Sequence, residues 1–449
     1  MTHTSARRAI VVGLGKSGIA AAKLLLSDGF EVIGTDSAPS ERISKEVTEL
    51  GLPVIAGGHS GVPFDEVELI VVSPGVPPLA ELAHAESKGV EVIGELELAA
   101  RHLQAPIIAV GGTNGKSTVT TLTALMLSEA GLRTFSGGNL GTPLSCAVGG
   151  TWDCLVVEVS SFQLERVVQF KPKVSILLNV TEDHLDRYAS FQGYAEAKGN
   201  AFVNQDHEDI AVIPWGDRVC EEQARRGAAR LVRFGSAGDF VARDRSVLET
   251  ATGEHFSLEG TRLHGAHNVS NAASCIAAAR ALGAAPSAIR KALADFVPLA
   301  HRMAFVAEHR GIRYYDDSKG TNVGASVTAL LGLSEARGVL IAGGRDKHGS
   351  YGPLVDALQA KGRGLVVIGE AAQAIASAAE HALPVERATS MADAVRKAQS
   401  LARPGDAVLL SPACASFDMF RSYADRGECF VSEVRALIQD DPQGSDVQC

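Results

Sequence analysis

A glycine-rich segment that contains a lysine and two hydroxyl residues is the part of this sequence best suited to chemistry. It reads Gly111-Gly112-Thr113-Asn114-Gly115-Lys116-Ser117-Thr118 and follows the apolar run 107–110. In such a loop backbone N–H groups hold phosphates, the lysine reaches the β- and γ-phosphates, and the serine hydroxyl ligates Mg²⁺. The loop is at least one residue shorter than the full G-x-x-x-x-G-K-[ST] pattern. We nevertheless predict a phosphate-binding loop, with a helix running on through residues 119–122.

Acidic residues follow two further apolar runs. The run 155–157 is followed by Glu158. The run 176–178 lies in a strand expected over 175–180, which is followed by Thr181-Glu182-Asp183-His184-Leu185-Asp186. A phosphate-binding loop of this kind needs another metal ligand from a neighbouring strand. Glu158 is the candidate for that ligand, and His184 for a second metal. The alternatives are an ordinary charged strand end for Glu158 and a solvated acidic loop for His184.

A second glycine cluster, Gly13-x-Gly15-x-x-Gly18, follows the apolar run 9–12. Its glycines allow a tight turn and a close approach to a phosphate, and the helix expected from about Ser17 favours an anion at its start. The next strand ends at Asp36, where an acidic residue commonly binds a ribose hydroxyl. Taken alone, this pattern fits a dinucleotide site and a dehydrogenase, or a glycine turn that serves only strand–helix packing. Ser73-Pro74-Gly75 forms a further loop or a simple turn.

The elements that must position these loops repeat one pattern: a short apolar run, a glycine-bearing turn and a helical stretch rich in Ala and Leu. This pattern is typical of parallel strands buried on both faces. It predicts three α/β domains, at residues 1–95, 96–299 and 300–449. In open α/β sheets ligands bind beyond the carboxyl ends of the strands, where all the loops above are expected.

Composition excludes several classes of protein. The chain has 449 residues, of which 46% are hydrophobic and 21% charged, as in ordinary globular proteins. Its net charge of −10 argues against a nucleic-acid partner. We expect no membrane span, because no apolar run approaches about 20 residues, and no exported chain, because no signal peptide is evident. The seven cysteines contain no C-x-x-C pair, so we expect reduced thiols without a zinc site, in a cytoplasmic protein.

Motifs along nearly the whole chain, in collinear order, resemble those of the Mur ligases, which build the peptide of peptidoglycan and are related to folylpolyglutamate synthetases. The resemblance rests on Gly112–Thr118, Asn179 with His184-Leu185-Asp186, His267-Asn268 with Asn271-Ala272, His301-Arg302, and Asp317-Ser318-Lys319 with Asn322. The segment Ser411–Ser416, with Phe420 and Arg426-Gly427, is similar to the D-glutamate-adding branch of the family.

The resemblance implies a Rossmann-like N-terminal domain for a UDP sugar, a P-loop-type central ATPase domain and a Rossmann-like C-terminal domain for the amino acid. It implies an ATP-dependent ligase that adds D-glutamate to UDP-N-acetylmuramoyl-L-alanine through an acyl phosphate, with Mg²⁺ as cofactor. The small-molecule ligands would span domains and not subunits, so we expect a monomer. The first glycine cluster would then hold a UDP pyrophosphate in place of a dinucleotide.

The resemblance also implies a role for individual residues. Lys116, His184 and Lys198 would be catalytic, and Ser117, Glu158, His184 and Lys198, the last as a carbamate, would hold metal. The ATP site would comprise Gly112, Thr113, Asn114, Gly115, Lys116, Ser117, Thr118, Asn271, Arg302, Asp317 and Lys319. The UDP-sugar site would comprise Leu14, Gly15, Lys16, Ser17, Asp36, Ser37, Ser73, Gly75 and Asn139. The D-glutamate site would comprise Thr321, Lys347, Ser416 and Phe417, with Arg345 as the alternative to Lys347.

Three rival functions remain open at the level of sequence. Another Mur ligase or a folylpolyglutamate synthetase would share the phosphate-binding loop but use a different amino acid or acceptor. A regulatory nucleotide-binding protein would hydrolyse ATP or GTP slowly without any amino acid. An NAD-dependent dehydrogenase would use Gly13, Gly15 and Gly18 but would leave Gly115-Lys116-Ser117 without a role.

Overall fold

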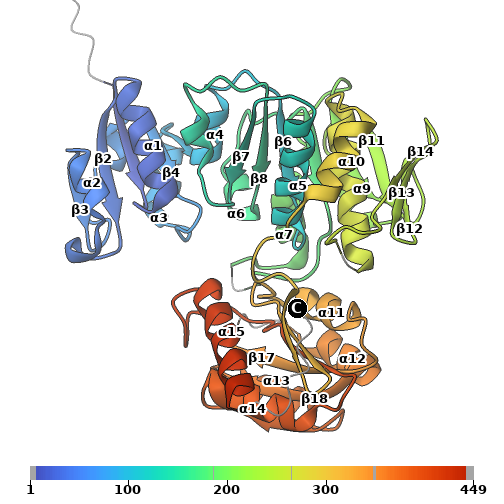
Figure 1. Ribbon diagram of the computed structural model, residues 1–449. Coiled ribbons are helices and arrows are strands. Elements are labelled where there is room, and N and C mark those ends of the chain that lie inside the picture. The colour runs from blue at the N-terminus through green and yellow to red at the C-terminus, as the bar shows by residue number, and fades with distance from the viewer. Residues whose placement is uncertain (1–6, 186, 264, 347–349, 441–449) are drawn as a thin grey trace, which may run out of the picture. The chain divides into compact units, whose positions relative to one another are not determined.

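The computed structural model describes residues 7–185, 187–263, 265–346 and 350–440 (Figure 1). Three β-sheets lie in this part of the chain, which confirms the predicted α/β class. One compact unit comprises the described residues up to Val180, with Gln192–Thr261 and Ser270–Phe296. A second unit comprises Thr181–Phe191, Arg262–Val269 and the described residues from Val297 onward. The domain limits near residues 95 and 299 stay predictions.

The first sheet has the strand order β3-β2-β1-β4-β5, and all its strand pairs are parallel. Its strands are β1 (Arg8–Val12), β2 (Glu31–Asp36), β3 (Val54–Ala56), β4 (Leu69–Val72) and β5 (Glu91–Gly94), and its helices are α1 (Lys16–Ser27), α2 (Lys45–Glu49) and α3 (Ala80–Ser87). Successive side chains of β1 alternate between two cores. Val11 packs with Leu25 of α1, and Ile10 packs with Leu82 of α3. Burial on both faces explains why these strands are apolar throughout.

The second sheet has the order β14-β13-β12-β11-β10-β9-β6-β8-β7 and becomes antiparallel only at β12–β14. Its strands are β6 (Ile107–Gly111), β7 (Thr134–Gly138), β8 (Cys154–Glu158), β9 (Val174–Leu177), β10 (Ile210–Pro214), β11 (Arg230–Gly235), β12 (Phe240–Arg243), β13 (Ser246–Glu249) and β14 (Glu254–Ser257). The associated helices are α4 (Glu95–Ala100), α5 (Lys116–Glu129), α6 (Ser161–Leu164), α7 (Phe191–Gly199), α8 (Arg218–Ala224), α9 (Ala266–Ala281) and α10 (Pro286–Asp295).

The strand expected over 175–180 ends at Leu177, three residues earlier than predicted. The chain beyond it bonds to the phosphate-binding loop: Leu178 N–H donates to Gly111 O at 3.2 Å, and Asn179 O accepts from Thr113 N–H at 3.0 Å. The apolar character of this segment therefore reflects burial beside the loop and not a longer strand.

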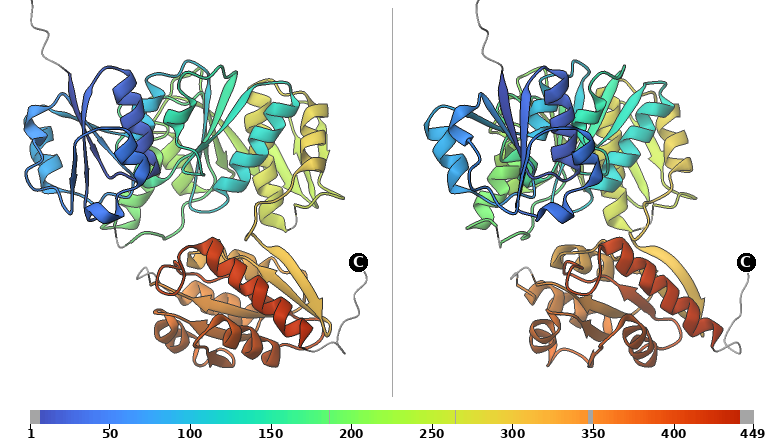
Figure 2. Two further views of the ribbon diagram at one scale, coloured as in Figure 1. Left: turned by 60° about the vertical axis from the view of Figure 1, so that its left-hand side comes forward. Right: turned by 90° about the vertical axis from the view of Figure 1, so that its left-hand side faces the viewer.

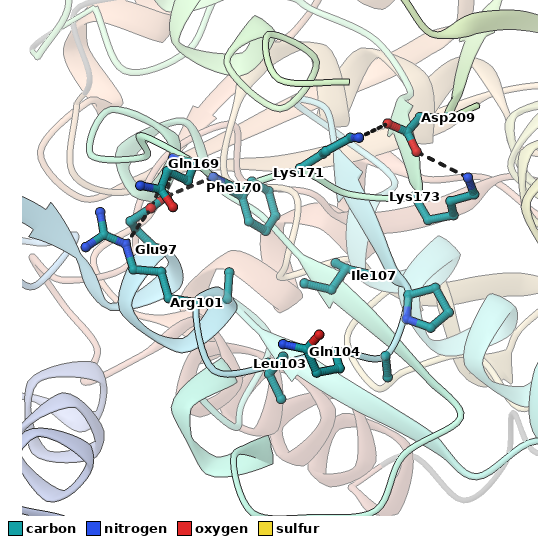
Figure 3. Close-up of a pocket in the computed structure, with 13 residues that line it drawn as sticks. Glu97, Arg101, Leu103, Gln104, Ile107, Gln169, Phe170, Lys171, Lys173 and Asp209 are labelled. Carbon is teal, nitrogen blue, oxygen red and sulfur yellow. Dashed lines mark hydrogen bonds and ion pairs between the residues drawn. The ribbon is translucent and has the colours of Figure 1, made fainter. Parts of the chain in front are cut away.

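Glu97 of α4 ties the start of the second sheet to the loop before β9 (Figure 3). Its carboxylate is fully buried and accepts hydrogen bonds from the backbone N–H groups of Val168, Gln169 and Phe170 and from Arg101 Nε at 2.8 Å. Glu97, Arg101, Gln169 and Phe170 border a cavity of about 440 Å³ at the amino end of β6. A buried carboxylate is stable here because four donor groups bond to its two oxygens.

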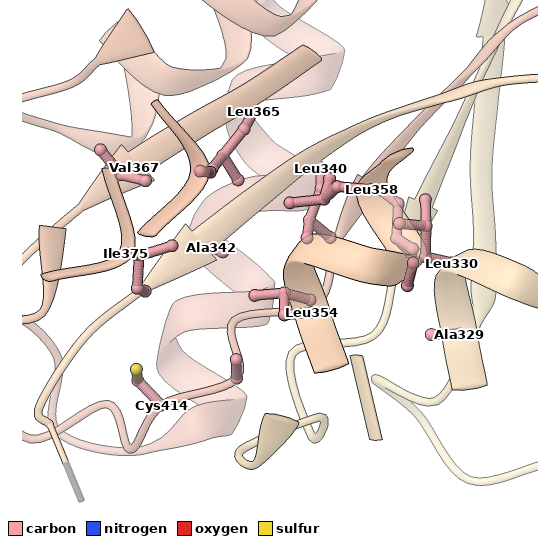
Figure 4. Packing of buried hydrophobic residues seen from close by; sticks show 14 of the residues in the cluster. Ala329, Leu330, Leu340, Ala342, Leu354, Leu358, Leu365, Val367, Ile375 and Cys414 are labelled. Atoms are coloured by element: carbon pink, nitrogen blue, oxygen red, sulfur yellow. The ribbon is translucent and has the colours of Figure 1, made fainter. Parts of the chain in front are cut away.

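The third sheet has the order β15-β16-β20-β17-β18-β19, with only β15–β16 antiparallel. Its strands are β15 (Ala304–His309), β16 (Ile312–Asp316), β17 (Gly338–Gly343), β18 (Gly362–Ile368), β19 (Val385–Arg387) and β20 (Ala407–Leu410), and its helices are α11 (Val323–Leu331), α12 (Gly352–Lys361), α13 (Ala372–Ala379), α14 (Met391–Leu401) and α15 (Tyr423–Gln439). Leu340 of β17 and Leu365 of β18 pack against Leu354 of α12 and Ile375 of α13 (Figure 4). Helix α15 lies along the other face, where Phe430 joins a second core (Figure 2).

Among the helices that the structure describes, none is long and apolar enough to cross a membrane.

Candidate active site

The phosphate-binding loop joins β6 to α5, as predicted from the sequence. Gly115 is the N-cap of α5 and has φ of 88°, a conformation that favours glycine. Gly112 also has a positive φ, of 138°. Lys116 Nζ donates to the carbonyl oxygens of Gly112 and Thr113 at 2.9 and 2.8 Å, so the ammonium group lies over the loop. Ser117 and Thr118 are buried in the first turn of the helix. The positive end of the helix dipole therefore adds to the charge of Lys116.

Two residues outside the predicted site brace this loop. The side-chain amide of Asn179 accepts from Asn114 N–H at 2.9 Å and donates to Asn114 O at 3.1 Å. The hydroxyl of Tyr194, which is buried in α7, lies 3.2 Å from Thr113 Oγ1. Asn179 follows directly after an apolar run, and this position in the sequence could have identified it as a loop residue near the site. No sequence pattern identifies Tyr194, because its contact with the loop depends on how α7 packs.

Glu158 ends β8 beside the phosphate-binding loop, because β8 pairs with β6 and places Glu158 opposite Val110. Its Oε1 accepts from Asn139 Nδ2 at 2.7 Å. Its Oε2 is buried and has no hydrogen-bond partner among the described residues. A buried carboxylate oxygen without a donor, at the edge of a phosphate-binding loop, suits a hard cation such as Mg²⁺. Asn139, a residue predicted for the UDP-sugar site, is therefore bonded to the predicted metal ligand Glu158. No described hydrogen bond joins it to the first sheet, which carries the other residues predicted for that site.

Lys198 is 3% exposed and lies on α7. Its Nζ donates to Gly112 O at 2.9 Å and lies 4.5 Å from the centroid of the Tyr194 ring. Lys198 is therefore not a solvated lysine of the helix surface. The structure brings Lys198 and Lys116 to the same carbonyl oxygen, that of Gly112.

Asn271 on α9 also reaches the loop. A Cβ atom at Gly115 would lie 2.8 Å from Asn271 Oδ1, so glycine is needed for the two elements to approach so closely. Asn271 is thereby placed with the other predicted ATP residues of the first unit.

The first sheet carries a separate group of predicted residues at the carboxyl ends of its strands. Asp36 accepts from Leu14 N–H at 2.6 Å and from Ala38 N–H at 2.8 Å, and Ser73 Oγ donates to Gly13 O at 2.7 Å. The carboxylate of Asp36 therefore shapes the glycine turn that begins α1. Exposed or half-buried positions around it are Gly15, Lys16, Ser17, Ser37 and Gly75.

A further group of predicted residues belongs to the second unit. His184 is half-buried with φ of 55°, and its Nε2 lies 3.7 Å from Asp183 Oδ2, which also accepts from Asn322 Nδ2 at 3.0 Å. Burial raises the pKa of Asp317 to about 7, against the opposing effects of a hydrogen bond from Ser411 Oγ and the charge of Arg302. Arg302 is therefore near enough to Asp317 to lower the pKa of that carboxyl group by its charge.

The remaining predicted residues follow β16 and β20. Lys319 Nζ lies 3.8 Å from the centroid of the Tyr423 ring, and Thr321 N–H donates to Lys319 O at 2.8 Å. Ser416 is buried, whereas the Phe417 side chain is 68% exposed. Lys347 lies outside the described residues, so its predicted role is open.

Three family models match the chain: the Mur ligase MurD-like N-terminal domain at residues 7–94, the Mur ligase middle domain at 110–279, and the Mur ligase glutamate ligase domain at 301–414. The UDP-N-acetylmuramoylalanine--D-glutamate ligase of Desulfosudis oleivorans is 42% identical over 98% of each chain. That of Geotalea uraniireducens is 41% identical over 96% of this chain and 98% of its own.

A solved structure, the MurF ligase of Thermotoga maritima in complex with ADP, covers 97% of this chain and 96% of its own, with a TM-score of 0.61 and 17% identity. At that identity it supports the fold alone. The two full-length relatives carry the assignment further: the chain belongs to the Mur ligase family, and its predicted resemblance to the D-glutamate-adding branch of that family is confirmed.

Proposed function

We propose that the chain catalyses the ATP-dependent addition of D-glutamate to UDP-N-acetylmuramoyl-L-alanine in the synthesis of peptidoglycan precursors. The observation that carries this proposal is identity of 42% and 41% to D-glutamate ligases over nearly the whole length of both chains. Another amino acid or a folate acceptor is less well supported, because both of these full-length relatives are named as D-glutamate ligases. A dehydrogenase would leave the loop around Lys116 without a role.

A carboxylate is a poor acyl donor, so the reaction needs transfer of the ATP γ-phosphoryl group to the substrate carboxylate. The resulting acyl phosphate has phosphate as its leaving group, which the amine of D-glutamate expels as the amide bond forms. Charge neutralisation of the transferred phosphoryl group is the main task of the site. Lys116 and the amino end of α5 would supply positive charge from the first unit, and Arg302 and Lys319 would contribute from the second.

Ser117 and Glu158 would hold Mg²⁺, with Asn139 orienting the carboxylate of Glu158. Bound Mg²⁺ would neutralise charge on the phosphate oxygens. His184 would hold a second ion in the assembled site. Asp317 would accept from the ribose of ATP, and Asn271 would contact ATP beside Gly115.

Lys198 would act as a carbamate. Its ammonium group would first lose one proton; the neutral amine nitrogen would then bond to the carbon of CO₂ and lose a second proton, so that a buried cation becomes an anion. Support comes from its burial beside the phosphate-binding loop, where the Gly112 carbonyl already accepts from Lys116. An anion there would complement both Lys116 and a metal ion, whereas a second ammonium group would repel them.

The UDP sugar would bind at the carboxyl edge of the first sheet, against the turn that Asp36 and Ser73 hold. D-Glutamate would bind in the second unit, at the loops that contain Thr321 and Ser416. Its side-chain carboxylate requires a cation, for which Lys347 and Arg345 are the two candidates.

The test is phosphate release from ATP, measured with each substrate omitted in turn. We expect release only when UDP-N-acetylmuramoyl-L-alanine and D-glutamate are both present. Release that requires L-alanine, or folate with L-glutamate, would reassign the enzyme within its family. Release without any amino acid would instead identify a nucleotide hydrolase.

A further inference from the structure

Arg426, in the first turn of α15, has a fully buried side chain at 1% exposure. No ion pair joins it to a carboxylate in the part of the chain that the structure describes. Burial lowers the pKa of its guanidinium group to about 10. The amino end of a helix is also unfavourable for a cation, because the helix dipole is positive there. Such a residue costs stability unless its donors meet acceptors of good geometry.

The acceptors of Arg426 come from three different loops. Its Nε donates to Ser318 Oγ at 3.0 Å and its Nη2 to Ser318 O at 2.9 Å. Its Nη1 faces Cys414 O at 3.2 Å, with Ala415 O and Gly343 O more distant at 3.4 and 3.5 Å. The planar guanidinium group presents its N–H donors in a fixed fork, which suits acceptors that lie in several directions.

These loops leave the carboxyl ends of β16, β17 and β20, which lie next to one another in the sheet. Further contacts hold them together: Ala413 N–H donates to Gly320 O at 2.9 Å, and Arg345 N–H donates to Ala415 O at 2.9 Å. Gly344 leaves room for the guanidinium group, since a Cβ atom there would lie 3.1 Å from Arg426 Nη1 and 2.2 Å from Ala415 O.

The same loops carry the residues assigned above to the two substrates of the second unit. Ser318 lies between Asp317 and Lys319 of the ATP site, and Cys414 and Ala415 precede Ser416 of the D-glutamate site. Ser318 Oγ also donates to Tyr423 O at 2.8 Å, and the ring of Tyr423 contacts Lys319. Both substrate loops are therefore hydrogen-bonded to one guanidinium group.

We propose that Arg426 is a positioning residue that fixes the spacing between two loops: residues 317–321 after β16, which carry Asp317 and Lys319 of the ATP site, and residues 413–417 after β20, which carry Ser416 of the D-glutamate site. It touches no substrate and acts only through Ser318, Cys414 and Ala415. The expected effect of Arg426 on the reaction rests on the proposed function, whereas its expected effect on the order of the two loops does not.

The variant that tests it is Arg426→Met, which keeps most of the side-chain volume and removes the donors. The matched control is Arg421→Met, which removes an exposed arginine that bonds to Asp425 at the start of the same helix. We expect kcat/KM for D-glutamate to fall about 10²-fold in Arg426→Met, the loss typical of a misplaced substrate contact. The KM for the UDP sugar should stay at the wild-type value, because its predicted residues lie in the other unit. Arg421→Met should match the wild type in both.

Hydrogen exchange provides a readout that does not depend on the reaction. We expect faster amide exchange within 317–321 and 413–417 in Arg426→Met and wild-type exchange in the other strands of the third sheet. Arg426→Lys keeps the charge without the planar fork and serves the same comparison if the methionine variant does not fold. Wild-type exchange in both loops, or an equal rise in the KM of every substrate, would overturn the proposal. A wild-type enzyme that releases no D-glutamate-dependent phosphate would refute the proposed function, while hydrogen exchange would still decide the role of Arg426.

Discussion

Replacing Glu97 by Gln should destabilise the first unit strongly, although the two side chains are almost the same size. Glu97 Oε1 accepts from Arg101 Nε at 2.8 Å and Gln169 N–H at 3.0 Å, and Oε2 accepts from Val168 and Phe170 N–H, both at 2.9 Å. A glutamine has only one acceptor atom. An NH₂ group at the Oε2 position would leave Val168 and Phe170 N–H unpaired. An NH₂ group at the Oε1 position would face Arg101 Nε, whereas Gln169 N–H would keep its bond to the other oxygen, at 3.1 Å.

Removing one member of a buried ion pair costs about 3–5 kcal/mol. Losing one or two hydrogen bonds to a charged group, at roughly 1.5–3 kcal/mol each, gives about 2–6 kcal/mol, which includes that range. We therefore expect the free energy of unfolding to fall by about 3–5 kcal/mol in Glu97→Gln. The matched control is Glu91→Gln, which removes the half-exposed carboxylate on the other side of Arg101 and should cost about 0–1 kcal/mol.

Urea unfolding followed by tryptophan emission is the suitable assay. Trp152 packs against the core that contains Leu96 and Phe170, its Nε1 donates to Ala147 O at 2.9 Å, and its ring lies 5.6 Å from that of Phe135. The second tryptophan, Trp215, is half-exposed after β10 and is replaced by Phe in every protein compared. The remaining emission then reports on the transition of this region, which matters because a chain of several domains need not unfold in one step. A loss below about 1 kcal/mol in Glu97→Gln, or equal losses in both variants, would refute the reasoning.

Three other outcomes are expected. Lys198→Ala should lose nearly all activity. The control Glu196→Ala, at an exposed site on the same helix, should keep it. Full activity in Lys198→Ala would contradict the proposed role of Lys198. Glu158→Gln should raise the Mg²⁺ concentration for half-maximal activity about 10–100-fold, because a neutral amide replaces a charged ligand; an unchanged Mg²⁺ titration would remove Glu158 from the metal site. The pKa of Asp317 rises from 3.8 to about 7 on folding, so between these pH values the folded chain binds a proton that the unfolded chain has released. The free energy of unfolding should therefore fall as pH rises through this window, and Asp317→Asn should make the fall smaller. Parallel curves of unfolding free energy against pH, from urea unfolding of the two proteins, would disprove this.

Local sequence was sufficient for the loops that begin helices. The runs 9–12 and 107–110 are apolar because both faces of their strands are buried, and the glycines after them mark the turns. Gly115 and Lys116 lie one after the other in the sequence, so the phosphate-binding loop can be recognised without knowing what surrounds it. The positions of Glu158 and His184 after apolar runs made them candidate metal ligands in the same way. Resemblance then supplied the predicted roles of Lys198 and of the ATP residues of the third sheet.

Contacts between distant segments could not be predicted in this way. Lys198 reaches the carbonyl oxygen of Gly112 across 86 residues of sequence, and a helix lysine carries no local sign of burial. The guanidinium group of Arg426 meets Ser318 across 108 residues, and Glu97 meets Phe170 across 73.

The difference has one physical cause. Strand burial, turn geometry and the start of a helix depend on side chains within a few residues of one another, so the sequence by itself determined the α/β class, the phosphate-binding loop and the family motifs. The partners of a buried charge are mostly backbone N–H and C=O groups, which every residue carries and which leave no mark in the sequence. Only the tertiary structure therefore decided how Lys198, Glu97 and Arg426 are held.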